Sequence, residues 1–325
     1  MSAVPSERRV TAADIARSLG ISRATVGFVL NDTPGQTISA ATRSRVLAEA
    51  DRLGYRPHQA ARALASGQSK IVLLILPDWP LEYSLSTHLE EASLALDEAG
   101  YSLVTWTRHA GGRARPLWET LQPDVVMSLT PLDPETASAI RRGGAVVVTP
   151  GEPGAPPAPL EYGTGPALQI QHLADRGHRR IVYAESADPR IADLVAERAG
   201  VAARAAAELR VSLDRRVVVE PEPSIVSEWV ASGVTAVAGY NDDIAARVLH
   251  AALLARIHVP SELAVVGHDD APISRLLMPA LSTVRVDNAG LGRFFAAIAL
   301  QAATGAPAPG AGPETRAELV HRSSS

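Results

Sequence analysis

From residue 71 onward, short and nearly continuous apolar segments alternate with amphipathic segments, and this alternation constrains the fold more than any other feature of the sequence. The segments predicted as strands are IVLLILP (71–77), YSLVTW (101–106), VVMSL (125–129), AVVVTP (145–150), RIVYAES (180–186), TAVAGY (235–240) and LAVVGHDD (263–270). Strands that are apolar on both faces must be covered on both faces, which predicts parallel sheets with helices on either side. The proline- and glycine-rich segment 150–165 predicts a crossover between two doubly wound lobes of an α/β body.

The first 56 residues show a different pattern, in which three apolar-periodic stretches each follow a hydroxyl side chain. Thr11 precedes AADIARSLG, Ser22 precedes RATVGFVLN, and Ser39 precedes AATRSRVLAEADRLG. A hydroxyl at this position caps the free N–H groups of a helix, so three helices are expected. The first two helices are joined by a turn of only Gly20 and Ile21, which the Ser22 cap of the second helix follows. This is helix-turn-helix spacing. We therefore predict a helical head at 1–56, a linker at 57–69 that is helical only when held, and the body at 70–325.

Charge is distributed unevenly between these regions. Residues 1–70 carry ten Lys and Arg against five Asp and Glu, whereas the remaining residues carry 21 against 30. The head thus has a charge of +5 and the rest −9, within a net charge of −4. A basic head suggests a polyanionic partner, although a solvated helical surface explains the charge alone equally well.

Longer stretches of the sequence resemble one known family. VTAADIARSLGISRATVGFVLN and ISAATRSRVLAEADRLGYRPHQAARAL resemble the DNA-binding head of LacI/GalR-type transcriptional regulators. The similarity continues through KIVLLILPD, HLADRGHRRIVY, AGYNDDIAARVL, VPSELAVVGHDD, PALSTVRVDNAGLGR and ELVHRSS. The resemblance implies a small all-α head, a hinge helix and a periplasmic-binding-protein-like body of two subdomains. It also implies a regulator, expected to be a repressor, that binds a near-palindromic operator as a homodimer and responds to a small effector.

The resemblance assigns DNA contacts to the head and hinge. The second helix, residues 22–30, would lie in the major groove, with Arg23 and Ala24 near the base edges. In the hinge, Leu64 matches the leucine that the family inserts into the minor groove. The expected DNA-contacting residues are Thr11, Ser22, Arg23, Ala24, Thr25, Phe28, Asn31, Ser39, Thr42, Tyr55, His58, Ala61 and Leu64. An ordinary three-helix core with an alanine-rich linker is the alternative interpretation.

Asn241 and Asp269 match the effector-binding polar residues of the family, and each follows an apolar strand at the edge that faces the expected cleft. Each is also in a position to cap a helix or a turn instead. The remaining expected effector contacts are Asp78, Tyr83, Tyr162, Arg190 and Arg198. Asp78 and Tyr83 fit cap or rim positions equally well.

Three positions depart from the family pattern. Glu197 stands where the family commonly has an arginine, Tyr162 where it has Asp or Asn, and Gly27-Phe28 where it has Ser-Arg. The first two predict that the pocket does not bind the family's customary sugar or purine unless Arg190 or Arg198 compensates. They also leave open a body that responds to another protein, while Gly27-Phe28 leaves open a degenerate head on a small-molecule-binding body.

The sequence gives little support to other classes of function. It lacks a G-x-S-x-G elbow, a P-loop and a G-x-G-x-x-G after a strand, and no histidines lie at metal-ligand spacing, so no enzyme, metal or cofactor is expected. Cysteine is absent and no long apolar run occurs, which predicts a cytoplasmic, nucleoid-associated protein without a membrane span. No leucine heptad follows residue 305, so a dimer is favoured over a tetramer.

Overall fold

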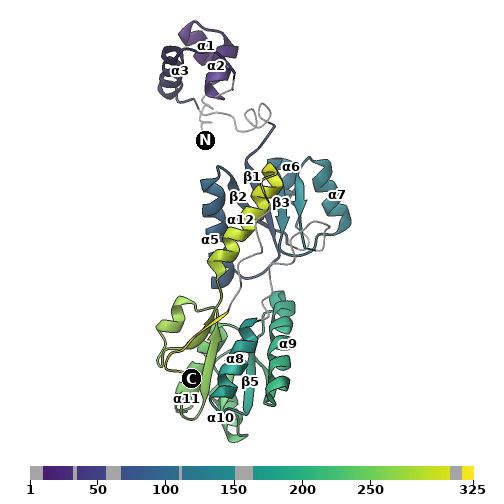
Figure 1. The fold of residues 1–325 in the computed structure, drawn as a ribbon, viewed down its shortest axis with the longest axis vertical. Helices are drawn as coiled ribbons and strands as arrows, with labels where there is room; N and C mark the ends of the chain where they lie inside the picture. Colours follow the sequence, from purple (N-terminus) through teal and green to yellow (C-terminus); the bar gives the residue numbers. More distant parts are fainter. Residues whose placement is uncertain (1–9, 32–34, 56–66, 110–111, 151–163, 308–316) are drawn as a thin grey trace, which may run out of the picture. The chain divides into compact units, whose positions relative to one another are not determined.

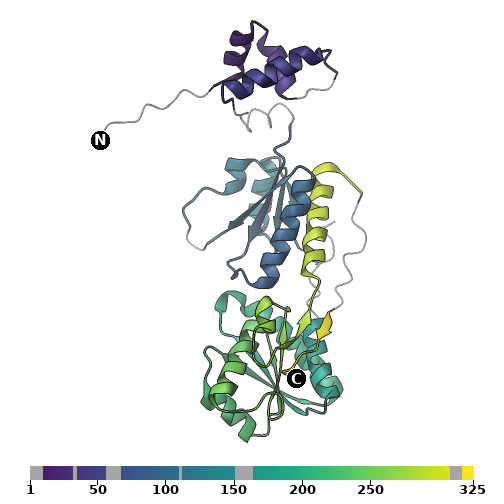
Figure 2. The same ribbon diagram turned by 90° about the vertical axis from the view of Figure 1, so that its left-hand side faces the viewer.

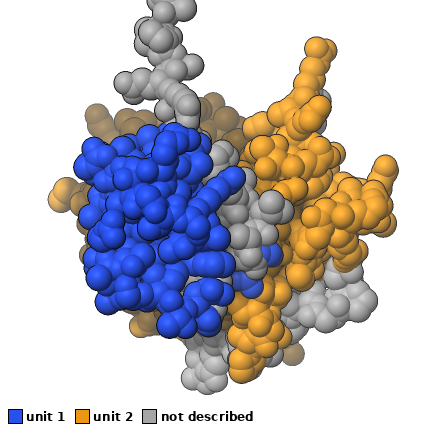
Figure 3. Space-filling model, turned by 90° about the horizontal axis from the view of Figure 1, so that it is seen from above, with its two compact units in different colours: residues 1–70 blue, residues 71–325 orange. Residues whose placement is uncertain are grey.

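The computed structural model describes residues 10–31, 35–55, 67–109, 112–150, 164–307 and 317–325. Contacts between residues divide the chain into two compact units, 1–70 and 71–325, which Figure 3 shows in blue and orange. The linker predicted at 57–69 lies mostly outside the described residues.

The head is built from α1 (Ala12–Leu19), α2 (Arg23–Leu30) and α3 (Ala40–Arg52), as the sequence predicted. α1 ends at Gly20, whose φ of 66° lies in the left-handed region that glycine adopts at low cost. One apolar core joins the three helices; its buried members are Ile15, Ala16, Val26, Val29, Val46 and Ala50. This core fixes which faces of α1, α2 and α3 remain exposed.

The first lobe of the body has a four-stranded parallel sheet in the order β2-β1-β3-β4. Its strands are β1 (Ile71–Leu76), β2 (Ser102–Thr107), β3 (Val125–Ser128) and β4 (Val146–Val148), and its helices are α5 (Tyr83–Glu98), α6 (Leu117–Leu121) and α7 (Pro134–Arg142). β1 is buried over nearly its whole length, as expected for a strand covered on both faces.

The second lobe has a six-stranded sheet in the order β10-β9-β8-β7-β5-β6. Its strands are β5 (Arg180–Ser186), β6 (Ser212–Val218), β7 (Ala236–Gly239), β8 (Ala264–His268), β9 (Ser282–Arg285) and β10 (Glu318–Val320). Its helical segments are α8 (Thr164–Asp175), η1 (Pro189–Ile191), α9 (Ala192–Leu209), α10 (Pro223–Ala231), α11 (Asp242–Leu254) and η2 (Pro272–Arg275). Only β10 runs antiparallel to its neighbour among the strands described here.

The fold class predicted from the sequence is confirmed, but the chain passes between the lobes more often than a single crossover would require. After β9, helix α12 (Asn288–Thr304) returns to the first lobe and lies beside α5 in both views (Figures 1 and 2). Its residues Ala296, Ile298 and Ala299 share one core with Val72 and Leu96. β10 then joins the second sheet. Each lobe is therefore completed by a segment that is distant in sequence.

Candidate functional site

The start of α2 leaves several side chains exposed. Ser22 caps the helix, its Oγ accepting the Thr25 backbone N–H at 3.0 Å, and the two hydroxyls lie 2.9 Å apart. Val26 and Val29 are buried in the core of the head, whereas Arg23 and Ala24 are exposed. Because Arg23 opens the helix, its guanidinium is presented at the end where free N–H groups favour an anion.

Gly27 and Phe28, where the sequence departs from the family pattern, both lie on the less buried side of α2. A Cβ placed on Gly27 meets no atom within 4 Å. Phe28 is half-buried, yet it is not among the residues that form the head core in the described part of the chain. Its ring therefore belongs to the surface of the helix rather than to the packing between helices.

The other head residues singled out from the sequence fall into two groups. Ser39 caps α3 in the same way as Ser22 caps α2, with its Oγ accepting the Thr42 N–H at 3.2 Å. Thr11 donates both its N–H and its hydroxyl to Asp14, at 2.9 and 2.7 Å. Asn31 ends α2 and is exposed, whereas Tyr55 packs against the head core. Thr11 and Ser39 thus cap helices, and Thr42 donates to the Ser39 cap, whether or not these residues contact a ligand.

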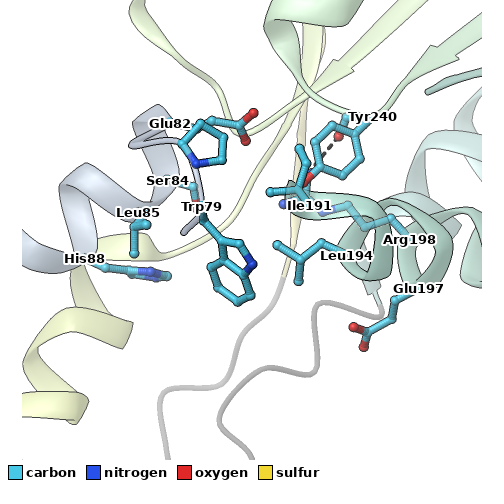
Figure 4. A pocket seen from close by; sticks show the side chains of 11 residues that line it. Trp79, Glu82, Ser84, Leu85, His88, Ile191, Leu194, Glu197, Arg198 and Tyr240 are labelled. Carbon is cyan, nitrogen blue, oxygen red and sulfur yellow. Dashed lines mark hydrogen bonds between the residues drawn. The ribbon is translucent and has the colours of Figure 1, made fainter. Parts of the chain in front are cut away.

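A cleft lies in the body and is lined from both lobes (Figure 4). Its walls come from the segment after β1, the first turns of α5, η1, α9 and the residue after β7. The lining residues are Trp79, Pro80, Glu82, Ser84, Leu85, His88, Ile191, Leu194, Glu197, Arg198 and Tyr240. These positions follow the carboxyl ends of strands or lie on the helices after them, where open α/β sheets bind ligands.

Trp79 occupies the middle of this cleft. Figure 4 shows its ring between Leu85 and His88 on one side and Ile191 and Leu194 on the other. It is carried by the first lobe but packs against the apolar core of the second. The aromatic ring therefore forms part of both walls.

Arg198 and Asp269 form a buried ion pair next to the cleft. The Arg198 guanidinium donates to Asp269 Oδ1 at 3.3 Å and to the Tyr240 carbonyl at 2.7 Å, and it lies 4.7 Å from the centre of the Tyr240 ring. Burial alone acts to raise the pKa of Asp269. The charge of Arg198 and the contact with His268 outweigh burial and lower this pKa to about 2. Burial lowers the pKa of His268, so a neutral ring donates from Nδ1 to Asp269 at 2.6 Å.

Glu82 brings a second carboxylate to the cleft from the opposite lobe. Its side chain is hydrogen-bonded to Asn241, whose Oδ1 also caps α11 by accepting the Ile244 N–H at 2.9 Å. Burial, and then the negative charge of Asp269, raise the pKa of Glu82. Nearby His88 has a buried Nε2 that meets no hydrogen-bond partner among the described residues, and burial lowers the pKa of its ring to about 4.

Of the expected effector contacts, Arg198 lines the cleft, and Asn241 and Asp269 are buried directly behind it. Asp78, Tyr83 and Arg190 are exposed and are not among the lining residues; Asp78 lies 3.5 Å from His109, and Arg190 pairs with Asp188 at 2.6 Å. Tyr162, and His58, Ala61 and Leu64 of the linker, lie outside the described residues.

The sequence reasoning missed Trp79, Glu82, His88 and Tyr240. Trp79 and Tyr240 could have been found, since both stand within three residues after the end of a strand that the pattern predicts. His88 could not, because its position in the cleft depends on how the two lobes meet.

Comparison with known proteins agrees with this architecture. Residues 11–58 match the model for bacterial regulatory proteins of the lacI family, and residues 170–325 match a periplasmic-binding-protein-like domain. The chain is 30% identical over 312 residues to the HTH-type transcriptional regulator GalS of Salmonella typhimurium, with 91% of each chain covered. It is also 30% identical over 315 residues to GalR of Escherichia coli, covering 92% of this chain and 91% of that one. The chain belongs to the LacI family.

Solved structures of the family share the fold. A lac repressor dimer bound to operator and the anti-inducer ONPF matches with a TM-score of 0.78 at 21% identity, over 98% of this chain and 99% of that one. A complex of the transcriptional regulator CelR with cellobiose matches with a TM-score of 0.63 at 22% identity, over 98% and 100%.

As a LacI-family member, the protein is a DNA-binding transcriptional regulator with a helix-turn-helix head and an effector-binding body. The described residues bring no three His, Cys, Asp or Glu side chains together as a metal site. Nor does any helix described here have the length and apolar character needed to cross a membrane.

Proposed function

We propose that the protein represses transcription by binding a near-palindromic operator as a homodimer, and that a small molecule in the cleft of the body changes its affinity for that operator. The observation that carries the proposal is the geometry of α2: a capped helix whose N-terminal Arg23 and Ala24 are exposed while Val26 and Val29 hold it to the head. Such a helix can enter a major groove without unfolding the core behind it.

The head residues divide between base edges and the phosphate backbone. Arg23 reaches guanine O6 and N7, and Phe28 contacts a thymine methyl or the sugar backbone. Thr25 and Asn31 extend this surface along α2. Thr11, Ser22, Ser39 and Thr42 stand at helix N-termini, where hydroxyls and backbone N–H groups meet phosphates, and Tyr55 contacts the backbone beside them. In the hinge, Leu64 is the residue proposed to enter the minor groove, with Ala61 packed beside it, and His58 is a further proposed DNA contact.

The effector is bound by the cleft through Arg198, Asn241 and Asp269, with Trp79 and Tyr240 as apolar surface. Asp78, Tyr83, Tyr162 and Arg190 remain candidates for its rim. An effector that binds two arrangements of the lobes with different affinity shifts their populations, and the hinge transmits this shift to the head. A ribose operon repressor of Bacillus subtilis is 28% identical over 303 residues, and the CelR structure that shares the fold is a complex with cellobiose, so sugars and related metabolites are the first compounds to test. The protein is not an enzyme, and it acts in the cytoplasm at the nucleoid.

A homodimer requires a face that pairs with its own copy. Four large apolar side chains, Leu253, Leu254, Leu276 and Met278, are more than half exposed at the end of α11 and in the segment after η2. α11 and η2 contact each other, and exposed apolar side chains on neighbouring elements can mark an interaction site. These side chains support the dimer and are our candidates for its interface.

Fluorescence anisotropy with the DNA upstream of the protein's own gene tests the proposal. We expect salt-dependent binding above that of random DNA of the same length, at one dimer per site. Arg23→Gln should reduce the preference for the specific site, whereas Arg17→Gln, on the exposed face of α1, should leave it unchanged. Equal affinity for specific and random DNA would contradict the proposal.

A further inference from the structure

The cleft carries more negative than positive charge. Glu82 and Glu197 line it, and Asp269 lies directly behind it, whereas Arg198 is the single cation among the described lining residues. Arg198 is already committed to Asp269. The outlying Arg190 is likewise paired with Asp188. The charge of Arg198 also acts on Glu82, and Glu82 acts on Arg190, but burial and the charge of Asp269 outweigh this attraction and raise the pKa of Glu82.

Glu82 is the more buried of the two carboxylates that line the cleft. It is half-buried, and Figure 4 shows its carboxylate directed toward the Tyr240 side of the cleft. Its side-chain partner is the neutral amide of Asn241, and the surrounding charges are those of Asp269 and Asp243 and, with the opposite sign, Arg198. A partly buried carboxylate among like charges gains most from a cation placed beside it.

The remaining walls suit an organic cation rather than a metal ion. Trp79 and Tyr240 present aromatic rings, and one of them already accepts a cation, since the Arg198 guanidinium lies 4.7 Å from the Tyr240 ring centre. The buried Nε2 of His88 lacks a partner within the described structure, and a neutral ring can accept a hydrogen bond there. Leu85, Ile191 and Leu194 supply apolar surface for the body of a ligand.

From this combination we infer that the effector is a small organic cation: an ammonium group held between Glu82 and the aromatic rings, attached to a ring or chain that fills the apolar part of the cleft. This inference rests on the proposed function, because it names the ligand class of the same cleft. A neutral sugar would place no cation beside Glu82. An anionic ligand would add a further charge of the same sign.

Thermal shift and isothermal titration calorimetry on the full chain test this directly. The probes are matched pairs that differ in the amine: glucosamine and glucose, galactosamine and galactose, phenethylamine and 2-phenylethanol, with agmatine as an extended cation. We expect at least one amine to raise the melting temperature in a dose-dependent way while its neutral partner does so at least tenfold less effectively.

Variants locate the binding. Glu82→Gln keeps the shape of the side chain and should weaken the amine about tenfold or more, whereas Glu90→Gln, on an exposed position of the same α5, should bind it like the wild type. Operator binding by Glu82→Gln shows that the variant is folded. Binding of a neutral sugar as strong as that of its amine, an unchanged affinity in Glu82→Gln, or no response to any amine would each overturn the inference. Operator binding by the wild type is measured separately, so a failure of the ligand inference can be distinguished from a failure of the protein to bind its operator.

Discussion

The Arg198 guanidinium lies 3.3 Å from the Asp269 carboxylate, and both side chains are buried beside the cleft of the body. Arg198 is on α9 and Asp269 follows β8, so the pair joins two elements of the second lobe. Arg198 also donates a hydrogen bond to the Tyr240 carbonyl, and His268 is hydrogen-bonded to Asp269. The pair thereby fixes the position of the residue after β7, which also lines the cleft.

Replacing Arg198 by methionine should destabilise the body by about 3–5 kcal/mol, because it leaves the buried Asp269 without its cation. Urea unfolding at pH 7 measures the loss. Arg204→Met is the matched control, since Arg204 lies on the same helix but is exposed, and its change should stay within about 0.5 kcal/mol. Equal stability of the two variants would show that a methionine at position 198 stabilises the body as well as the ion pair does.

Asp242 should make the stability of the body fall as pH rises from about 4 to about 7. Its side chain is buried and accepts the Ala271 N–H at 2.6 Å and the Thr283 hydroxyl at 2.5 Å. Burial raises its pKa to about 7, despite these two hydrogen bonds. Between about pH 4 and pH 7 the unfolded chain has therefore lost a proton that the folded protein still holds. Linkage then gives a decrease of up to about 1.4 kcal/mol per pH unit over this window.

The measurement is the difference between wild type and Asp242→Asn in urea at pH 5, 6, 7 and 8. Buried histidines act in the opposite direction, because burial lowers the pKa of His88 and His172 to about 4 and so destabilises the folded protein as pH falls. They are common to both proteins and cancel in the difference. The advantage of Asp242→Asn should grow from pH 5 to 7 and then level off. A difference independent of pH would mean that Asp242 titrates normally.

Gly27 should be replaceable by alanine with a gain in stability. A Cβ at this position meets nothing within 4 Å, and glycine within a helix costs about 1 kcal/mol relative to alanine. Amide hydrogen exchange on α1 and α2 in the full chain should show about fivefold greater protection in Gly27→Ala. Gly20→Ala is the contrasting change: its φ of 66° strains a residue with a Cβ, so protection should fall. Loss of protection in Gly27→Ala would show that the site is crowded.

The sequence predicted the parts of the fold that local pattern controls. The caps Ser22 and Ser39, the buried β1 and the two-lobed body all lie where hydroxyls, apolar runs and a proline-rich break indicated. β6 was missed because its SLDRRVV is mostly exposed and charged, as an edge strand can be. α12 was missed because its glycines, Gly290 and Gly292, weaken a helical pattern. Gly292 is needed where a Cβ would lie 2.5 Å from the His88 carbonyl of α5.

The cleft was predicted only in outline. Asn241 and Asp269 were singled out because each follows a strand and matches a family position, and Arg198 because it stands beside Glu197, where the family has an arginine. The ion pair between Arg198 and Asp269 was not predicted, because the two residues are 71 positions apart in the sequence. Asp78 and Tyr83 follow the same strand as Trp79, and the pattern does not distinguish which of them faces inward. Which of these side chains faces inward depends on the backbone path between β1 and α5, and the hydrophobic periodicity of the sequence does not predict this path.

Phe28 gives the sharpest test of how the head reads DNA. The ring is half-buried but outside the head core, so Phe28→Arg should fold normally and change the DNA contact alone. A guanidinium there can reach guanine or phosphate, so one base pair in each half-site should change its preference. If both protomers gain a phosphate contact, the slope of log affinity against log salt should steepen by about 2. Phe28→Leu, which keeps an apolar side chain, should leave the slope as in the wild type. Systematic half-site substitution with anisotropy at several salt concentrations measures both effects. Unchanged preference and slope in Phe28→Arg would show that this face of α2 does not meet the operator.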